Sequence, residues 1–187
     1  QTDFYICDNV LVGPHSWPIQ HWEEAQGIDM SGEGHVVCNN QISGFDDALR
    51  TSQKGARAND FIGNDVLFGW DNGIEFDYSA GNTRALRNRF CNTLEAISFQ
   101  PVYGGPAYAV RNVVLNGTAL KINYLGGTPP QLPSGVIVLH NTFLPGGVGL
   151  YGGNNRAYNY QLSNNLFYGT VPNPISEYVA FWNPSIT

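Results

Sequence analysis

The chain has 187 residues, of which 42% are hydrophobic and 13% are charged, and its formal net charge is −6. This composition excludes a disordered polyelectrolyte and leaves room for one domain with a sizeable core. It also argues against nucleic acid as a partner, because phosphate binding needs clustered cations and the only lysines are Lys54 and Lys121. No run of about 18 apolar residues occurs, so no membrane insertion is expected.

Taken in chain order, the first feature is Asn9 in the segment CDNVL, followed by the insertion GPHSWPIQHWEEAQ at positions 13–26. Within this insertion Ser16 suits a helix N-cap and Pro18 a first-turn position. The pattern predicts one short helix on a loop, packed on the surface of the domain.

Beyond the insertion, asparagines recur at a fixed spacing. Asn40, Asn64, Asn88 and Asn112 are 24 residues apart, and Asn141 follows after 29. Asn164 or Asn165 continues the series, and a proline-rich segment at 128–135, expected to be an extended loop, accounts for the longer step. Apolar residues lie two positions before and after most of these asparagines, which indicates strands with the asparagine on the apolar face.

An inward asparagine at a fixed phase has a physical reason. In stacked coils its amide can hydrogen-bond the equivalent amide of the coils above and below, so that each buried amide is satisfied by its copies. One coil of about 24 residues cannot close a core alone, whereas coils stacked about 4.8 Å apart can. The sequence therefore predicts an all-β solenoid of about seven coils with an asparagine ladder.

A second pattern follows each ladder position, in which a small residue precedes an apolar anchor. The anchors are Ile28, Leu49, Ile74, Ile97, Leu120 and Leu150. With the anchors inward, the next residue of each strand should point outward, which gives the row Asp29, Arg50, Glu75, Ser98, Lys121 and Tyr151. The outward position two residues later holds Asp77, Gln100 and Asn123 in successive coils. The inside of this strand is constant while its outside varies, as expected of a scaffold with a functional face.

The repeats resemble the right-handed parallel β-helix of the pectate-lyase-like superfamily. The segments GIDMSGEGHVVCNNQISGFDDA, QPVYGGPAYAVRN and GVIVLHNTFL resemble a largely uncharacterised group of bacterial proteins with this repeat. The resemblance covers nearly the whole chain and implies one β-helix domain over residues 1–187, with part of a longer solenoid as an alternative. It does not fix an activity, because the superfamily includes lyases, hydrolases, epimerases and binding modules.

Charged groups, amides and aromatic residues on one long face suit a polysaccharide, and a secreted or cell-surface carbohydrate-active protein is expected. If the reaction is β-elimination on a uronate, Arg50 would neutralise the substrate carboxylate, Lys121 with a depressed pKa would be the base, and Tyr124 or Tyr151 the acid. If it is hydrolysis, Glu75 and Asp77 are the carboxylates to test, with Asp47 or Glu95. Substrate contacts are expected from Asp29, Gln100, Asn123, Tyr78, Tyr103 and Tyr124.

Other interpretations stay open. The same face would serve a non-catalytic glycan-binding or surface-structural module, and alternating charges on successive coils also suit plain cross-strand pairing. Arg87, Arg111 and His140 form a rival basic face that would attract an acidic polymer.

The remaining motifs predict little chemistry. Cofactors are not expected, and calcium stays an option without an obvious ligand cluster. His15, His21 and His35 have no metal-ligand spacing and are assigned to loops or the surface. Cys7 and Cys38 share an inward column on neighbouring coils, where they either stack as thiols or bond. The sequence leaves the oligomeric state open.

Overall fold

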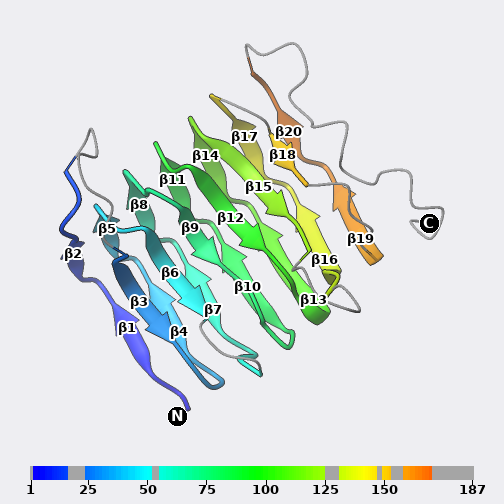
Figure 1. Cartoon of the computed structure of the whole chain (residues 1–187), viewed down its shortest axis with the longest axis horizontal. Helices are drawn as coiled ribbons and strands as arrows, with labels where there is room; N and C mark the ends of the chain where they lie inside the picture. Colours follow the sequence, from blue (N-terminus) through cyan, green and yellow to red (C-terminus); the bar gives the residue numbers. More distant parts are fainter. Residues whose placement is uncertain are drawn as a thin grey trace.

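A computed structural model describes residues 2–16, 24–51, 55–124, 131–146, 149–152 and 158–169. They form a parallel β-solenoid of three sheets in which strands of successive coils lie side by side (Figure 1). The first sheet contains β1 (Tyr5–Cys7), β4 (Val36–Cys38), β7 (Asp60–Ile62), β10 (Thr83–Leu86), β13 (Tyr103–Val110), β16 (Ser134–Leu139) and β19 (Tyr158–Ser163). The second contains β2 (Val10–Val12), β5 (Gln41–Ser43), β8 (Asp65–Leu67), β11 (Arg89–Cys91), β14 (Val113–Leu115), β17 (Thr142–Leu144) and β20 (Leu166–Phe167). The third contains β3 (Gln26–Met30), β6 (Asp47–Thr51), β9 (Asn72–Glu75), β12 (Glu95–Phe99), β15 (Thr118–Ile122) and β18 (Leu150–Tyr151).

The predicted all-β solenoid is confirmed, with a slightly smaller coil count. The sheets have seven, seven and six strands, and the regular stack amounts to about five turns where the sequence predicts about seven coils. No helix occurs among the described residues, and hence none there that is long and apolar enough to cross a membrane. The predicted insertion helix falls on residues 17–23, outside the described part of the chain.

The asparagine ladder is present at the turn between the first and second sheets. Asn64 shows the repeating pattern: its backbone N–H and its Nδ2 both donate to Asn88 Oδ1, at 2.9 and 3.0 Å. Its Nδ2 also donates to the carbonyl of Val37 on the preceding coil at 3.0 Å. Asn165, not Asn164, ends the ladder and accepts from Asn141 Nδ2 at 2.9 Å. The buried amides are therefore satisfied by one another and by the backbone.

The residue before each ladder asparagine has a left-handed backbone that allows the short turn. This position is occupied by Asn39, Gly63, Arg87, Arg111, His140 and Asn164, with φ between 53° and 65°. Asparagine and glycine tolerate this region well, whereas arginine and histidine there are uncommon.

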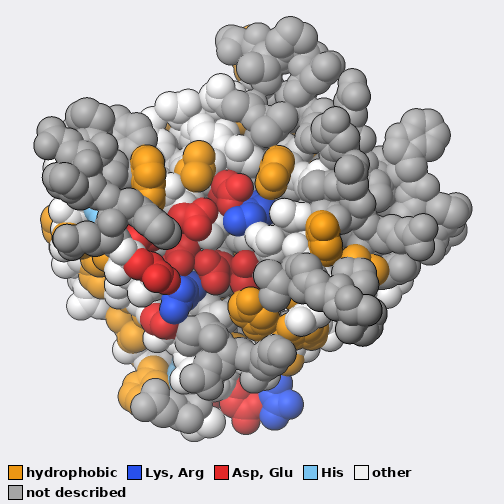
Figure 2. All heavy atoms as spheres, viewed as in Figure 1, with side chains coloured by type: hydrophobic (Ala, Val, Ile, Leu, Met, Phe, Trp, Pro, Cys, Tyr) orange, Lys and Arg blue, Asp and Glu red, His pale blue; other side chains and the backbone are white. Residues whose placement is uncertain are grey.

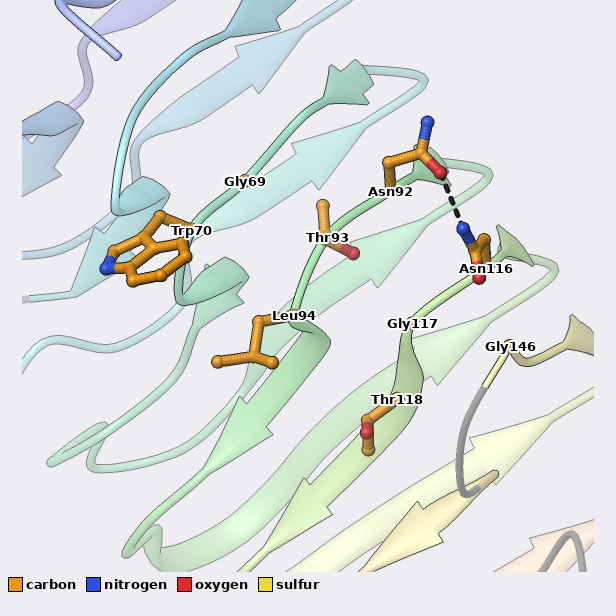
Figure 3. A pocket seen from close by; sticks show the side chains of 9 residues that line it. All are labelled: Gly69, Trp70, Asn92, Thr93, Leu94, Asn116, Gly117, Thr118 and Gly146. Atoms are coloured by element: carbon orange, nitrogen blue, oxygen red, sulfur yellow. Dashed lines mark hydrogen bonds between the residues drawn. The ribbon is translucent and has the colours of Figure 1, made fainter. Parts of the chain in front are cut away.

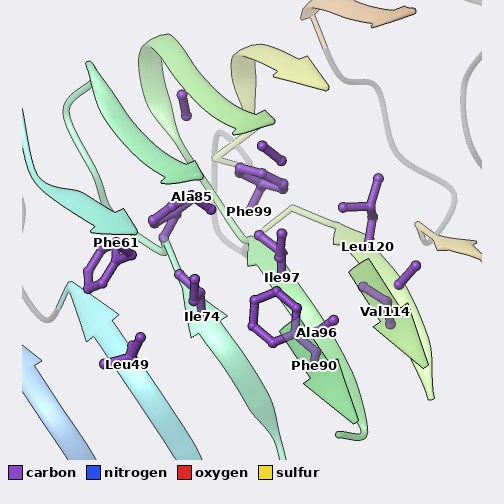
Figure 4. Packing of buried hydrophobic residues seen from close by; sticks show 14 of the residues in the cluster. Leu49, Phe61, Ile74, Ala85, Phe90, Ala96, Ile97, Phe99, Val114 and Leu120 are labelled. Carbon is purple, nitrogen blue, oxygen red and sulfur yellow. The ribbon is translucent and has the colours of Figure 1, made fainter. Parts of the chain in front are cut away.

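The core is one continuous stack of apolar side chains between the three sheets (Figure 4). Phe61 and Phe76 come from one coil and Phe99 from the next, and the ring centroids of Phe76 and Phe99 lie 5.4 Å apart. All three are fully buried, as are the anchors from Leu49 to Leu150. The sequence-predicted inward column of the third sheet is thus confirmed.

A disulfide joins the first two coils. Cys7 and Cys38 are partners in adjacent parallel strands, with Cα atoms 4.5 Å apart, and they are bonded. The alternative of bonding is therefore the one that the structure shows, while Cys91 remains a free, half-buried thiol.

Candidate functional site

The outward row of the third sheet has the predicted register. Parallel pairing places Asp29 beside Arg50, Arg50 beside Glu75, and Ser98 beside Lys121. Lys121 in turn pairs with Tyr151. Ser98 differs from its neighbours because it is fully buried, and its hydroxyl donates to Asp77 Oδ1 at 2.8 Å.

A second outward row, which sequence reasoning did not recognise as a row, lies at the start of the same strands. It consists of Asp47, Asn72 and Glu95, each two residues before an anchor. Asn72 Nδ2 donates to Asp47 Oδ1 at 2.9 Å and to Glu75 Oε2 at 3.2 Å. Arg50 lies 3.5 Å from Asp47 Oδ2, so the two rows meet on one face.

Strict alternation fails here because the small residue and the anchor are both buried. Ala48, Ala96 and Ala119 are at most 1% exposed, like the anchors that follow them. A Cβ on Gly73 would lie 2.5 Å from the ring of Phe90 in the core, so this position faces inward as well. The repeated small residue before each anchor was the signal that could have revealed the second row.

Glu75 and Asp77 are the most perturbed carboxyl groups of the described face. Burial, together with the charges of Asp77 and Asp47 and a hydrogen bond with Asp47, raises the pKa of Glu75 to about 9. Burial also raises the pKa of Asp77 to about 7, although its Oδ1 accepts hydrogen bonds from the Gln100 N–H at 2.6 Å and from Ser98. Glu75 is therefore protonated at neutral pH, while Asp77 changes between its protonated and ionised forms near pH 7.

The two cations in the described part of this face are both paired with carboxylates. Arg50 lies 3.1 Å from Asp29 Oδ2, and Lys121 Nζ lies 2.8 Å from Glu95 Oε2. Burial alone would lower the pKa of Lys121, but Glu95, Asp71 and Asp77 outweigh it and raise that pKa. The expectation of a depressed Lys121 pKa is therefore wrong, and this lysine is a charged partner, not a ready base.

Figure 2 shows the resulting surface: acidic side chains gather around two basic patches in the middle of this face, and hydrophobic side chains lie on either side. Among the described residues of this face the carboxylates outnumber the cations, since Asp46 and Asp71 add to the carboxylates named above. We call the set of Asp47, Asn72, Glu75, Asp77, Glu95, Arg50 and Lys121 the acidic site.

Most of the predicted contact residues follow the carboxyl ends of third-sheet strands: Tyr78 follows β9, Gln100 follows β12, and Asn123 and Tyr124 follow β15. Asp29 lies within β3, and Tyr103 begins β13 of the first sheet. Gln100 Nε2 donates to the carbonyl of Tyr124 at 3.2 Å, and Asn123 Oδ1 accepts from the Tyr124 N–H at 2.9 Å. The rings of Tyr78 and Tyr103 are 6.1 Å apart, and Tyr103 is 39% exposed. The structure thus brings the predicted carboxylates, cations and aromatic residues onto one side of the solenoid.

The rival basic face lies at the turns beside the asparagine ladder. Arg87, Arg111 and His140 are exposed and occupy the left-handed turn position beside the ladder.

The described histidines lie in loops, as one of the two expected alternatives. His35 precedes β4, is only 2% exposed, and contacts the carbonyl of Ser31 at 3.1 Å, so it is a loop residue but not a surface residue. His15 is nearly buried and lies 3.5 Å from Asp46, while His21 falls outside the described residues. Across the described ranges, no group of three or more His, Cys, Asp or Glu side chains is arranged to hold a metal ion.

Comparison with known proteins does not assign this chain to a family. No protein-family model matches the chain, and neither curated proteins nor solved structures give a match.

Proposed function

We propose that this protein is a carbohydrate-active β-helix protein that hydrolyses a polysaccharide bound along the third sheet. The observation that carries the proposal is the gathering of Glu75, Asp77 and Asp47 at one largely buried site, which also raises the pKa of Glu75 to about 9. Glycoside hydrolysis requires one carboxylic acid that keeps its proton and a second carboxyl group that ionises. Glu75 suits the first role because it is protonated at neutral pH, and Asp77 suits the second because its pKa is about 7.

Hydrolysis fits the acidic site better than β-elimination. Elimination needs a cation free to neutralise a uronate carboxylate and a base that is unprotonated at working pH. Arg50 and Lys121 are instead held by Asp29 and Glu95, and the pKa of Lys121 is raised. In this assignment the cations hold the side chains of Asp29 and Glu95 in place.

The charge of the site also favours a neutral polysaccharide. An acidic polymer would approach a surface whose described residues include more carboxylates than cations, and like charges at short range repel. Side-chain amides such as Gln100, and the exposed tyrosines, offer hydrogen bonds and apolar faces to sugar rings without requiring charge.

A non-catalytic glycan-binding module is the second candidate. It would use the same face for contact and would show ion pairs spaced along a flat sheet, as in Asp29–Arg50 and Glu95–Lys121. The convergence of Glu75, Asp77 and Asp47 supports an enzyme, because binding alone has no use for carboxyl groups whose charges oppose each other.

The Cys7–Cys38 disulfide supports a secreted or cell-surface location, since such bonds persist in oxidising compartments. Three parallel sheets and an asparagine ladder likewise support membership of the pectate-lyase-like superfamily, with its right-handed coil, as part of this proposal.

Incubation with neutral and acidic polysaccharides tests the activity, with reducing ends and unsaturated products measured separately. We expect reducing ends from a neutral polymer, and their loss in Glu75→Gln. Glu33→Gln is the matched control, because Glu33 pairs with Arg57 at an exposed position away from the third sheet. Unsaturated products would indicate a lyase, and binding without any products would indicate the glycan-binding module.

A further inference from the structure

We infer that a pocket beside the acidic site binds one uncharged sugar unit and thereby fixes the register of the polysaccharide on the third sheet. The pocket has a volume of about 320 Å³, at the small end of the range for ligand sites. It lies at the turns that lead from the second sheet to the third, in the coils of β9, β12 and β15 (Figure 3). The inference rests on the proposed function for what occupies the neighbouring acidic site.

The chemistry of the lining identifies the ligand class. Trp70 and Leu94 give the pocket apolar surface. Leu94 is 58% exposed and does not belong to the apolar core. Asn92 and Asn116 lie on the other side, where Asn116 Nδ2 donates to Asn92 Oδ1 at 2.7 Å (Figure 3). An apolar surface opposite amides matches a sugar ring, which has an apolar face and a rim of hydroxyl groups.

Among the residues that the structure describes, no charged side chain lines this pocket, although carboxylates dominate the adjacent face. A charged ligand would be left without a counterion there, at a desolvation cost. Thr93 is 1% exposed and its hydroxyl oxygen is closed off from solvent. The more exposed amides of Asn92 and Asn116 are therefore the side chains that can hydrogen-bond a sugar hydroxyl. The lining therefore indicates an uncharged polyhydroxylated ligand.

The position of the pocket links it to the acidic site. Trp70 is followed directly by Asp71, and Leu94 by Glu95, which forms the ion pair with Lys121. Thr118, another lining residue, is the parallel partner of Glu95 in the third sheet. A sugar unit in the pocket would therefore leave the next units over Glu95 and, one strand away, Glu75.

Coil packing explains the glycines of the pocket but not its apolar side chains. A Cβ on Gly117, which has φ +98°, would lie 1.8 Å from the Thr93 carbonyl oxygen, and one on Gly69 would lie 3.0 Å from Thr93 Cγ2. These glycines allow successive turns to approach each other. An exposed Leu94 beside Trp70 has no such structural role, which supports a role in binding.

Binding measured by calorimetry and tryptophan fluorescence tests the pocket. The probes are neutral oligosaccharides of glucose, xylose and mannose, with oligogalacturonate as the acidic comparison. We expect a neutral oligosaccharide to bind and Trp70→Leu to weaken binding by about tenfold or more. Leu94→Ala should weaken it less, and the matched control Leu67→Ala, at a similarly exposed leucine of the second sheet, should not change it.

The outcomes separate the pocket from the proposed hydrolysis. Binding that depends on Trp70 and Leu94, but without reducing-end release, supports the pocket and counts against catalysis. Hydrolysis with an unchanged KM in Leu94→Ala and Trp70→Leu overturns the pocket. If Trp70→Leu fails to fold, Trp70→Phe and Leu94→Ala carry the test. Binding of only the acidic probe, or of no probe, overturns the inference.

Discussion

Lys121 Nζ lies 2.8 Å from Glu95 Oε2, and this ion pair joins the adjacent strands β15 and β12 across the acidic site. Both side chains are mostly buried, with 15% and 13% of their surfaces exposed. Removing one partner of such a pair leaves the other charge poorly solvated. The pair therefore gives Lys121 a structural role that its position in the sequence does not reveal.

Lys121→Met should consequently destabilise the fold. The sequence pattern alone predicts that Lys121→Ala removes turnover with little loss of melting temperature, but the pairing with Glu95 changes that expectation. We expect the free energy of unfolding to fall by about 1–3 kcal/mol, measured by denaturant titration. The double variant Lys121→Met/Glu95→Gln should recover part of this loss, whereas equal stability of Lys121→Met and wild type would contradict the role of the pair.

Asn88→Ala should destabilise the ladder. Asn88 Oδ1 accepts from the N–H and Nδ2 of Asn64, and Asn88 Nδ2 donates to Asn112 Oδ1 and to the Phe61 carbonyl. Its loss leaves buried groups unsatisfied on both neighbouring coils, at about 1–3 kcal/mol for each group that finds no other partner. Gln41→Ala, an exposed amide of the second sheet, is the control, and an unchanged denaturation midpoint for Asn88→Ala would refute the prediction.

The ladder and the core could be predicted from the sequence because both repeat every coil. One asparagine and one small-apolar pair per 24 residues fix the phase of each strand. The row Asp47, Asn72 and Glu95 was missed because two consecutive buried residues interrupt period-2 alternation. The pKa of Lys121 depends on Glu95 of the neighbouring coil, and such contacts follow from the stacking geometry, which periodicity alone does not specify.

The activity should show a bell-shaped dependence on pH. Asp77, with a pKa of about 7, must lose its proton, and Glu75, with a pKa of about 9, must keep its own. Because the two groups interact, these values belong to the pair, and kcat/KM should rise through about 7 and fall through about 9. An initial-rate profile from pH 5 to 10 checks this, and an optimum near pH 4 would contradict it.

Stability should depend on Glu75 in the opposite sense to an ordinary salt-bridged carboxylate. The pKa of Glu75 in the folded protein is about 9, above its ordinary value of 4.5. The contribution of the neutral Glu75 carboxyl to the free energy of unfolding is therefore fully present below pH 4.5, and it is lost as pH rises through about 9. Glu75→Gln keeps the neutral form, and its melting temperature at pH 9 should exceed that of wild type by about 2–4 °C or more. At pH 4 the two should agree, and a lower melting temperature for the variant at pH 9 would refute the burial of an opposed carboxyl group.

Reduction of the Cys7–Cys38 disulfide should destabilise the first coil. The bond closes a segment with a sequence separation of 31, and cross-linking a segment of this length stabilises a fold by about 3–4 kcal/mol in the chain-entropy model. The double variant Cys7→Ser/Cys38→Ser should show a comparable loss and should not change further with reductant. Cys91→Ser keeps the disulfide and should lose stability on reduction as wild type does. Identical melting curves for oxidised and fully reduced protein would contradict this contribution.

The structure of Glu75→Gln with a neutral oligosaccharide tests the central claim most directly. The account predicts sugar units along the outward face of the third sheet, with a glycosidic oxygen within hydrogen-bond distance of the residue 75 side chain. Sugar bound instead at Arg87, Arg111 and His140, with the acidic site empty, would contradict it.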